Sequence, residues 1–221
     1  GFRLMDNFMM PYFAVSVKDF WRRWHISLST WLRDYIYIPL GGSRCSKMRK
    51  YLNIFITFMV SGLWHGAAWT YIVWGMLHGF YQIIEDCLRP VKRRFDAKYN
   101  VRTGTTGYRV LRMIVTFILV DFAWIFFKSA GIGDALRFVQ RIFVHMDPWV
   151  LADGSVFFSL GLSTAETEIL LIAVLILLAA DIIQYRTNKN FSEYLSGQCL
   201  VFRWLVILAV LFMVLIWGEY G

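Results

Sequence analysis

Apolar residues recur every three or four positions between Ser16 and Ile36, and this spacing predicts an amphipathic helix over residues 16–36. The apolar positions are Phe20, Trp24, Leu28, Trp31 and Tyr35, and the polar positions include Lys18, Arg22, Ser29 and Arg33. Ser16 followed by Asp19 resembles a capping box, and Pro39 marks the end of the pattern. A helix that carries three arginines does not cross lipid alone. We therefore expect it to lie at the membrane interface or to pack into a bundle.

The apolar stretch from Tyr51 to Leu88 is too long for one crossing of a membrane. As a single helix it would extend about 57 Å, whereas the hydrocarbon core of a bilayer is about 30 Å thick. Both flanks are basic, and Gly62 and Gly66 weaken the helix near the letters SGLWHG. We predict a helical hairpin over residues 51–88 that reverses there. Unwound backbone at this depth needs protein or a water-filled cavity around it, so a pocket is implied beside His65.

Three further stretches are predicted transmembrane helices, over residues 110–127, 166–184 and 201–217. Hydrophobic residues make up 58% of the chain, against roughly 45–50% in soluble domains. The pattern predicts an all-α fold in which residues 1–221 form a single multi-pass transmembrane helical bundle with interfacial and re-entrant helices.

The formal net charge of +8 is concentrated in two basic loops, residues 43–50 and 89–109. Basic loops between apolar segments are typical of the cytoplasmic side of a membrane. Because these loops flank membrane-length segments, we expect the lipid bilayer and no nucleic acid as a partner. Cys45, Cys87 and Cys199 have neither metal nor redox spacing and are expected to be free thiols.

Histidines in apolar surroundings are the main candidates for chemistry. A neutral imidazole in a low-dielectric cavity accepts a proton near neutral pH, and general-base catalysis contributes a factor of about 10²–10⁴. His65 is the candidate base, and the alternative is a hydrogen bond to a carbonyl of a neighbouring helix. His78 shares a helix face with Tyr71 and Glu85, where it either orients a substrate or fastens two helices. His25 lies between the apolar and the polar positions of its predicted helix. It either lies at the edge of a pocket or is a histidine at the membrane interface.

The sequence disfavours other kinds of site. His25, His65 and His78 form no HxxxH or HxH pair and have no carboxylate at ligand spacing, so no metal is expected. A hydrolase triad is not supported either, because no serine lies in a G-x-S-x-G context. Asp121 and Asp181 lie within apolar runs and are either functional or paired with a neighbouring helix.

Two long stretches resemble the membrane-bound O-acyltransferase (MBOAT) superfamily. They read DFWRRWHISLSTWLRDYIYIPLGGSR and SGLWHGAAWTYIVWGMLHG, and their sequences most resemble the branch that contains the alginate O-acetyltransferase membrane subunit. The letters AWIFFK resemble a later signature of that family, with Lys128 where the family has arginine. The resemblance spans the whole chain and implies the C-terminal portion of an MBOAT fold. We therefore expect the chain to be a fragment of a longer protein that lacks part of the bundle.

The resemblance also implies roles for particular residues. The histidine of WHG is taken as catalytic in this family and corresponds to His65, and the histidine of WHIS is a second essential position, His25. We further expect a substrate-binding set that consists of His78, Tyr71, Trp64, Arg33 and Asp34. No metal or bound cofactor is expected.

The implied activity is that of an O-acyltransferase (an acetyltransferase) of the bacterial inner membrane. An acyl group, which we expect to be acetyl, moves from a thioester donor, acetyl-CoA or an acyl carrier, to hydroxyls of an exported polysaccharide or to an intermediate carrier. A periplasmic or extracellular acetylation partner protein is implied as well. The basic loop residues suit the phosphates of the donor; they are Arg44, Lys47, Arg49 and Lys50. The alternatives are D-alanyl transfer to teichoic acids and a non-catalytic acyl-transport or scaffold subunit.

Overall fold

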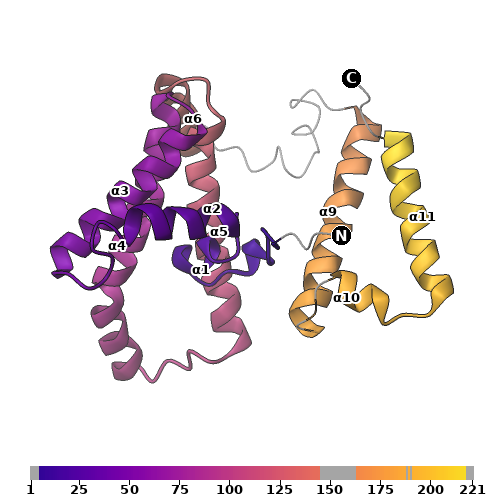
Figure 1. The fold of residues 1–221 in the computed structure, drawn as a ribbon, viewed down its shortest axis with the longest axis horizontal. Helices are drawn as coiled ribbons and strands as arrows, with labels where there is room; N and C mark the ends of the chain where they lie inside the picture. The colour runs from indigo at the N-terminus through magenta and orange to yellow at the C-terminus, as the bar shows by residue number, and fades with distance from the viewer. Residues whose placement is uncertain (1–4, 145–162, 188, 190, 218–221) are drawn as a thin grey trace. The chain divides into compact units, whose positions relative to one another are not determined.

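The computed structural model describes residues 5–144, 163–187, 189 and 191–217. Within these ranges every regular element is a helix, which confirms the predicted all-α class. The chain folds as two units, residues 1–147 and residues 148–221 (Figure 1). The second unit contains α9 (Thr164–Thr187), α10 (Phe191–Ser196) and α11 (Leu200–Trp217).

The first unit is built around three long helices. Its elements are η1 (Pro11–Phe13), α1 (Val17–Trp21), α2 (Ile26–Leu32), the π-helical turn η2 (Arg33–Tyr37), α3 (Lys47–His65), α4 (Trp69–Lys98), α5 (Thr106–Lys128) and α6 (Ile132–Val144). Helices α3 and α4 pack as a hairpin, α5 packs against α4, and α1 lies across both α4 and α5 (Figure 1). The short N-terminal helices therefore cross the long ones near the middle of their length.

The single helix predicted over residues 16–36 is broken in the structure. Helix α1 begins as expected, because the Ser16 hydroxyl accepts a hydrogen bond from the Asp19 N–H at 3.0 Å. It ends after Trp21, and the chain restarts as α2 after His25, whose φ of 43° lies in the left-handed region. A non-glycine residue holds this conformation only where surrounding contacts impose it. The spacing of apolar residues therefore carried no sign of the break.

The α3–α4 hairpin is held by a close approach of two backbones. A Cβ atom at Gly75 would lie 2.2 Å from the carbonyl oxygen of Phe58, so only glycine permits this contact. The chain reverses at residues 66–68, inside the stretch predicted to form the hairpin. Helix α4 continues past Pro90 to Lys98, beyond the predicted end of the hairpin at residue 88.

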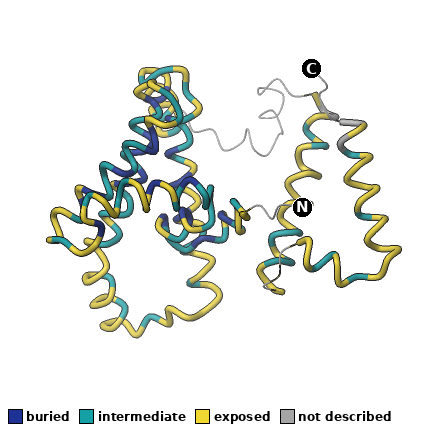
Figure 2. Tube along the Cα trace, in the orientation of Figure 1, coloured by how far each residue is buried: buried dark blue, intermediate teal, exposed yellow. Residues whose placement is uncertain are grey.

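Helices also form over the three segments predicted to cross the membrane, as α5, α9 and α11. Among the described residues, α5 alone is both long and apolar enough to span a bilayer, and the apolar run of α11, Leu200–Met213, is shorter. Most side chains of α9 and α11 are exposed within their own unit (Figure 2). Exposed apolar helices of this kind need lipid or further protein to cover them.

The core of the first unit is strongly aromatic. Its buried members are Ala14, Val17, Phe20, Trp21, Trp74, Val120, Ala123, Phe126 and Ala135. Partly buried rings that pack against them include Trp24, Phe58, Tyr81, Trp124 and Phe127. Most of these residues come from α1, α3, α4 and α5, and Ala135 comes from α6, so the core lies where the short helices cross the long ones (Figure 2). The candidate site is built around this core.

Candidate functional site

His65 is the last residue of α3, and its half-buried ring lies among aromatic side chains. The centroid of the imidazole is 4.9 Å from that of Trp64, 5.3 Å from Trp74, 5.1 Å from Phe127 and 6.3 Å from Tyr71. No residue in the described part of the chain forms a hydrogen bond with this imidazole. Neither ring nitrogen is therefore held by a hydrogen bond within the described ranges.

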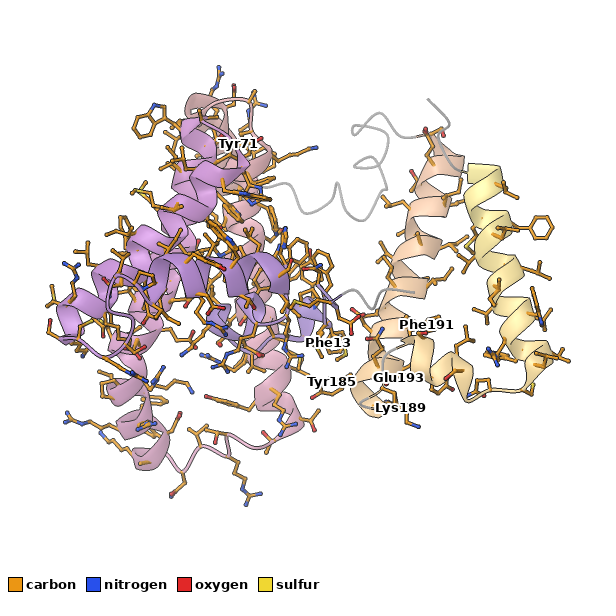
Figure 3. All side chains as sticks on the ribbon, in the orientation of Figure 1. Phe13, Tyr71, Tyr185, Lys189, Phe191 and Glu193 are labelled. Carbon is orange, nitrogen blue, oxygen red and sulfur yellow. The ribbon has the colours of Figure 1, made fainter. Side chains whose placement is uncertain are left out.

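Gly66 ends α3 and turns the chain toward α4. Its φ of 152° is accessible to glycine at little cost. A Cβ atom at this position would also lie 2.9 Å from the ring of Tyr71, which is labelled in Figure 3. The glycine of the WHG motif thus lets the Tyr71 ring, which contacts Phe127 at 4.9 Å, pack close to the turn that follows His65.

The structure brings His25 close to His65. The ring centroid of His25 lies 6.0 Å from that of Trp64, the same indole that His65 contacts. The Nδ1 atom of His25 is buried, and it has no hydrogen-bond partner among the described residues. The two histidines predicted to be catalytic therefore share Trp64 as a neighbour.

Asn7 holds the turn that carries His25. Its side-chain Oδ1 accepts hydrogen bonds from the backbone N–H of Ser27 at 3.0 Å and from the Ser27 hydroxyl at 2.5 Å. The backbone carbonyl oxygen of Asn7 accepts a third hydrogen bond, from the Ile26 N–H at 3.0 Å. His25, at the N-cap position of α2, makes no side-chain cap of its own. Asn7 could not be predicted from the sequence, because a cap supplied from twenty residues away leaves no local pattern.

His78 occupies the centre of the aromatic core, where its side chain is 0% exposed. Its ring centroid is 5.1 Å from that of Trp21 and 5.0 Å from that of Trp74, and it stacks on Phe20 at 6.3 Å. Neither ring nitrogen finds a hydrogen-bond partner within the described ranges. Trp74 contacts both His78 and His65 and so lies between them.

A polar pocket of about 530 Å³ adjoins the same core. Its lining comes from α1, α2, η2, α3 and α4, and Trp21 and Phe58 of the aromatic core belong to it. The charged lining residues are Lys18, Arg22, Arg33, Lys50, Arg89, Glu85 and Asp86. The neutral polar ones are Ser29, Thr30, Tyr37, Ser43, Thr57 and Gln82. Of the basic loop residues predicted to meet the donor, Lys50 is in this lining, whereas Arg44, Lys47 and Arg49 are not.

Ion pairs connect the helices around the pocket. Asp86 is 2.7 Å from the Lys50 amine and 3.0 Å from the Arg89 guanidinium, which joins α3 to α4. Arg112 of α5 pairs with Glu85 at 2.7 Å and donates to the Val15 carbonyl at 3.0 Å. These bonds fix the segment before α1 against the hairpin. They also occupy both carboxylates of the pocket.

Arg33 and Asp34 bind each other. The guanidinium Nε lies 2.7 Å from the Asp34 carboxylate, and both side chains are exposed. The hydrogen bond from Arg33 lowers the pKa of the Asp34 carboxyl. Arg33 also reaches the pocket lining, whereas Asp34 does not.

None of the remaining candidates lines the pocket. Asp121 is exposed on α5, and Asp181 is partly buried on α9 of the second unit. All three cysteines are free thiols, as predicted. In the described ranges no three His, Cys, Asp or Glu side chains are grouped so as to hold a metal ion.

Comparison with known proteins identifies the family. Residues 2–125 match the family model described as MBOAT, membrane-bound O-acyltransferase family. The chain is 39% identical to the probable alginate O-acetylase AlgI of Azotobacter vinelandii, over 89% of this chain and 36% of that protein. It is 38% identical to the peptidoglycan O-acetyltransferase of Helicobacter pylori, over 62% of the chain and 25% of the relative. It is 31% identical to the teichoic acid D-alanyltransferase of Bacillus subtilis, over 58% of the chain and 33% of that relative.

The chain thus spans between 25% and 36% of the length of these relatives. The matched region contains α1 to α4 and nearly all of α5, and with them both histidines and the pocket. The family model covers more than half of the chain. This match confirms the family that the two long motifs predicted, and the chain belongs to the membrane-bound O-acyltransferase family.

Proposed function

We propose that this chain forms the reaction-centre portion of a multi-pass O-acyltransferase of the bacterial inner membrane. It moves an acetyl group from a cytoplasmic thioester donor toward hydroxyls of an exported polysaccharide or of an intermediate carrier. The observation that carries the proposal is that His65 and His25, from separate motifs, meet beside Trp64 within the region matched by the family. The names of two relatives, an alginate O-acetylase and a peptidoglycan O-acetyltransferase, support acetyl transfer to a sugar polymer.

His65 acts as the general base in this mechanism. Its imidazole takes the proton of the acceptor hydroxyl while the hydroxyl oxygen attacks the carbonyl carbon of the thioester. The C–S bond then breaks, and the sulfur leaves as a thiol after it receives the proton from the imidazolium. The rings of Trp74, Phe127 and Tyr71 exclude water from one side of the base. His25 positions one of the two reactants.

The predicted substrate-binding residues have different roles in this proposal. Trp64 and Tyr71 flank His65 and are proposed to contact the reactants there. Arg33, braced by Asp34, is proposed to face an anionic group in the pocket. His78 is enclosed by aromatic rings. A substrate can contact it only by inserting between these rings. An acetylation partner protein outside the membrane completes the proposed pathway.

A complementation experiment tests the base. An acetylation-deficient strain receives the complete gene, with or without His65→Ala, and the ester content of its exported polymer is measured against time. We expect the initial rate to fall by about 10²–10⁴. His145→Ala, a histidine outside the motifs, serves as the matched control at equal protein level. A normal ester content with His65→Ala would reject catalysis and favour an acyl-transport or scaffold subunit.

D-alanyl transfer to a teichoic acid is the second candidate, because a D-alanyltransferase is among the relatives. The two candidates differ in the acid that the polymer carries. Mild alkaline hydrolysis followed by mass spectrometry identifies this acid directly. Acetate supports the first candidate and D-alanine the second.

A further inference from the structure

The segment that carries His25, residues 7–27, is closed by hydrogen bonds of its own. Two backbone bonds join its ends: the Met9 N–H donates to the Arg23 carbonyl at 2.9 Å, and the Ile26 N–H donates to the Asn7 carbonyl at 3.0 Å. The side-chain bonds of Asn7 described above add to this closure. Because all of these bonds lie within the segment, they hold its shape but not its position on the long helices.

Aromatic packing seats segment 7–27 on the long helices, where α1 lies across α4 and α5 (Figure 1). Three of its rings contact rings of α4 and α5, namely Phe20 with His78, Trp21 with Trp74 and Trp24 with Trp124. The hydrophobic effect behind such contacts is non-directional. It presses the segment onto the helices, but it does little to prevent small shifts along their surface.

Arg112 of α5 supplies directional bonds between the segment and the hairpin. Its Nε atom donates to the Val15 carbonyl at 3.0 Å, and its Nη2 atom donates to the Glu85 carboxylate of α4 at 2.7 Å. Arg112 and Val15 lie 97 positions apart in the chain, so their bond forms only after folding. One guanidinium group thereby joins segment 7–27, α4 and α5.

The surroundings of this link make it stronger than a surface ion pair. The side chains of Arg112 and Glu85 are only 28% and 30% exposed, so solvent and salt screen their attraction less. Hydrogen bonds between ionised groups are also stronger than neutral ones. Arginine suits the position because its planar group presents several donors in a rigid fork, whereas lysine offers a single ammonium. A lysine would not hold both acceptors in the same geometry.

The link lies at the start of the part of the segment that leads to His25. Val15 comes directly before Ser16, which caps α1, and α1 leads into the turn that carries the histidine. The His25 ring contacts Trp64 of α3 at 6.0 Å, so its place depends on how the segment lies over the hairpin. A misplacement of about 1 Å by a change far from the chemistry can cost about 10²-fold in rate.

We propose that Arg112 is a positioning residue for acyl transfer. By joining Val15 to Glu85, it fixes where segment 7–27 lies on the hairpin and therefore where His25 lies relative to His65. The inference rests on the proposed function, because it takes His25 to position a reactant. Arg112 acts through His25 and has no contact of its own with the reactants in this proposal.

The rate of acetylation tests the inference first. An acetylation-deficient strain expresses the complete protein, and the initial rate of ester formation on its exported polymer is normalised to the amount of folded protein. We expect Arg112→Gln to lower this rate about tenfold, a loss of ~1.4 kcal/mol, and Arg112→Lys to lower it as well. Glu85→Gln keeps an acceptor oxygen and should retain most of the rate. Arg109→Gln removes an exposed arginine of the same helix and is the matched control.

The same substitution in a His25→Ala background separates positioning from a general structural role. If Arg112 acts through His25, its loss should change the rate of the His25→Ala protein by less than about twofold, because residues that act through one another are not additive. An equal, tenfold loss in both backgrounds would overturn the inference. So would an Arg112→Gln rate equal to that of Arg109→Gln. If Arg112→Gln does not accumulate, Arg112→Lys and Glu85→Ala provide the same comparison.

Hydrogen exchange of the detergent-purified complete protein reports the anchoring without any turnover. We expect Arg112→Gln to speed exchange in peptides from residues 7–27 and to leave peptides of α9 unchanged. Unchanged exchange in both would contradict the anchoring. If exchange rises but His65→Ala leaves acetylation intact, the catalytic proposal fails and the anchoring by Arg112 stands. If His65→Ala abolishes acetylation but Arg112→Gln has a normal rate, only the positioning role of Arg112 fails.

Discussion

Replacing Asn7 by alanine should misplace His25 without changing any ring that surrounds it. The Asn7 side chain supplies two hydrogen bonds to Ser27, one to its backbone and one to its hydroxyl. Because these bonds cap α2, they hold the residue just before the helix, His25, in its left-handed conformation. The substitution therefore tests whether the position of His25 depends on a residue that precedes the WHIS motif.

The energies involved are of similar size. A hydrogen bond contributes about 0.5–1.5 kcal/mol net, so the two bonds of the Asn7 side chain stabilise the turn by about 1–3 kcal/mol. A left-handed conformation at a residue other than glycine costs about 1–2 kcal/mol. Without the cap, the favourable term no longer exceeds this cost, and His25 relaxes toward an ordinary φ. We expect the rate of acyl transfer to fall roughly tenfold, as a difference of about 1.4 kcal/mol implies.

The assay is the initial rate of ester formation in membranes that contain the complete protein, normalised to the amount of protein. Asn7→Asp keeps the side-chain acceptors and should retain most of the activity. Thr105→Ala removes a comparable cap, the hydroxyl that accepts from the Tyr108 N–H at 3.3 Å, at the start of α5. Its stability loss should be similar and its rate unchanged. Equal normalised rates for Asn7→Ala and Thr105→Ala would refute the positioning role.

A further prediction concerns the hairpin. Gly75→Ala should lower the melting temperature of the detergent-solubilised protein, because its Cβ would meet the Phe58 carbonyl and overpacking costs about 1–3 kcal/mol; Gly107→Ala, in open space, should leave it unchanged.

Local patterns were sufficient to predict the hairpin but not the break in the N-terminal helix. The hairpin follows from the length of an apolar stretch and two glycines near its middle, all of which a short window of sequence contains. The break at His25 depends on Asn7, which lies far from Ser27 in the chain and contacts it only after folding. Propensity does not encode such a contact.

The arrangement of the candidate site depends on the fold for the same reason. The motifs identified His65 and His25, and their shared contact with Trp64 required the fold. Lys18 and Arg22 were recognised as polar positions of a helix, but whether they meet solvent or a pocket is decided by how α1 packs across α4.

The predicted polar stripe of α4 passes through three environments, because the residues from Tyr71 to Glu85 span about 21 Å of helix. Tyr71 lies beside His65, His78 lies in the aromatic core, and Glu85 lines the pocket. One helix face therefore runs from the charged pocket to the proposed base. In the proposed mechanism this separation has a chemical use. The cations of the pocket stay on one side of a layer of rings, and the thioester meets a neutral imidazole on the other, where fewer water molecules compete with the acceptor hydroxyl.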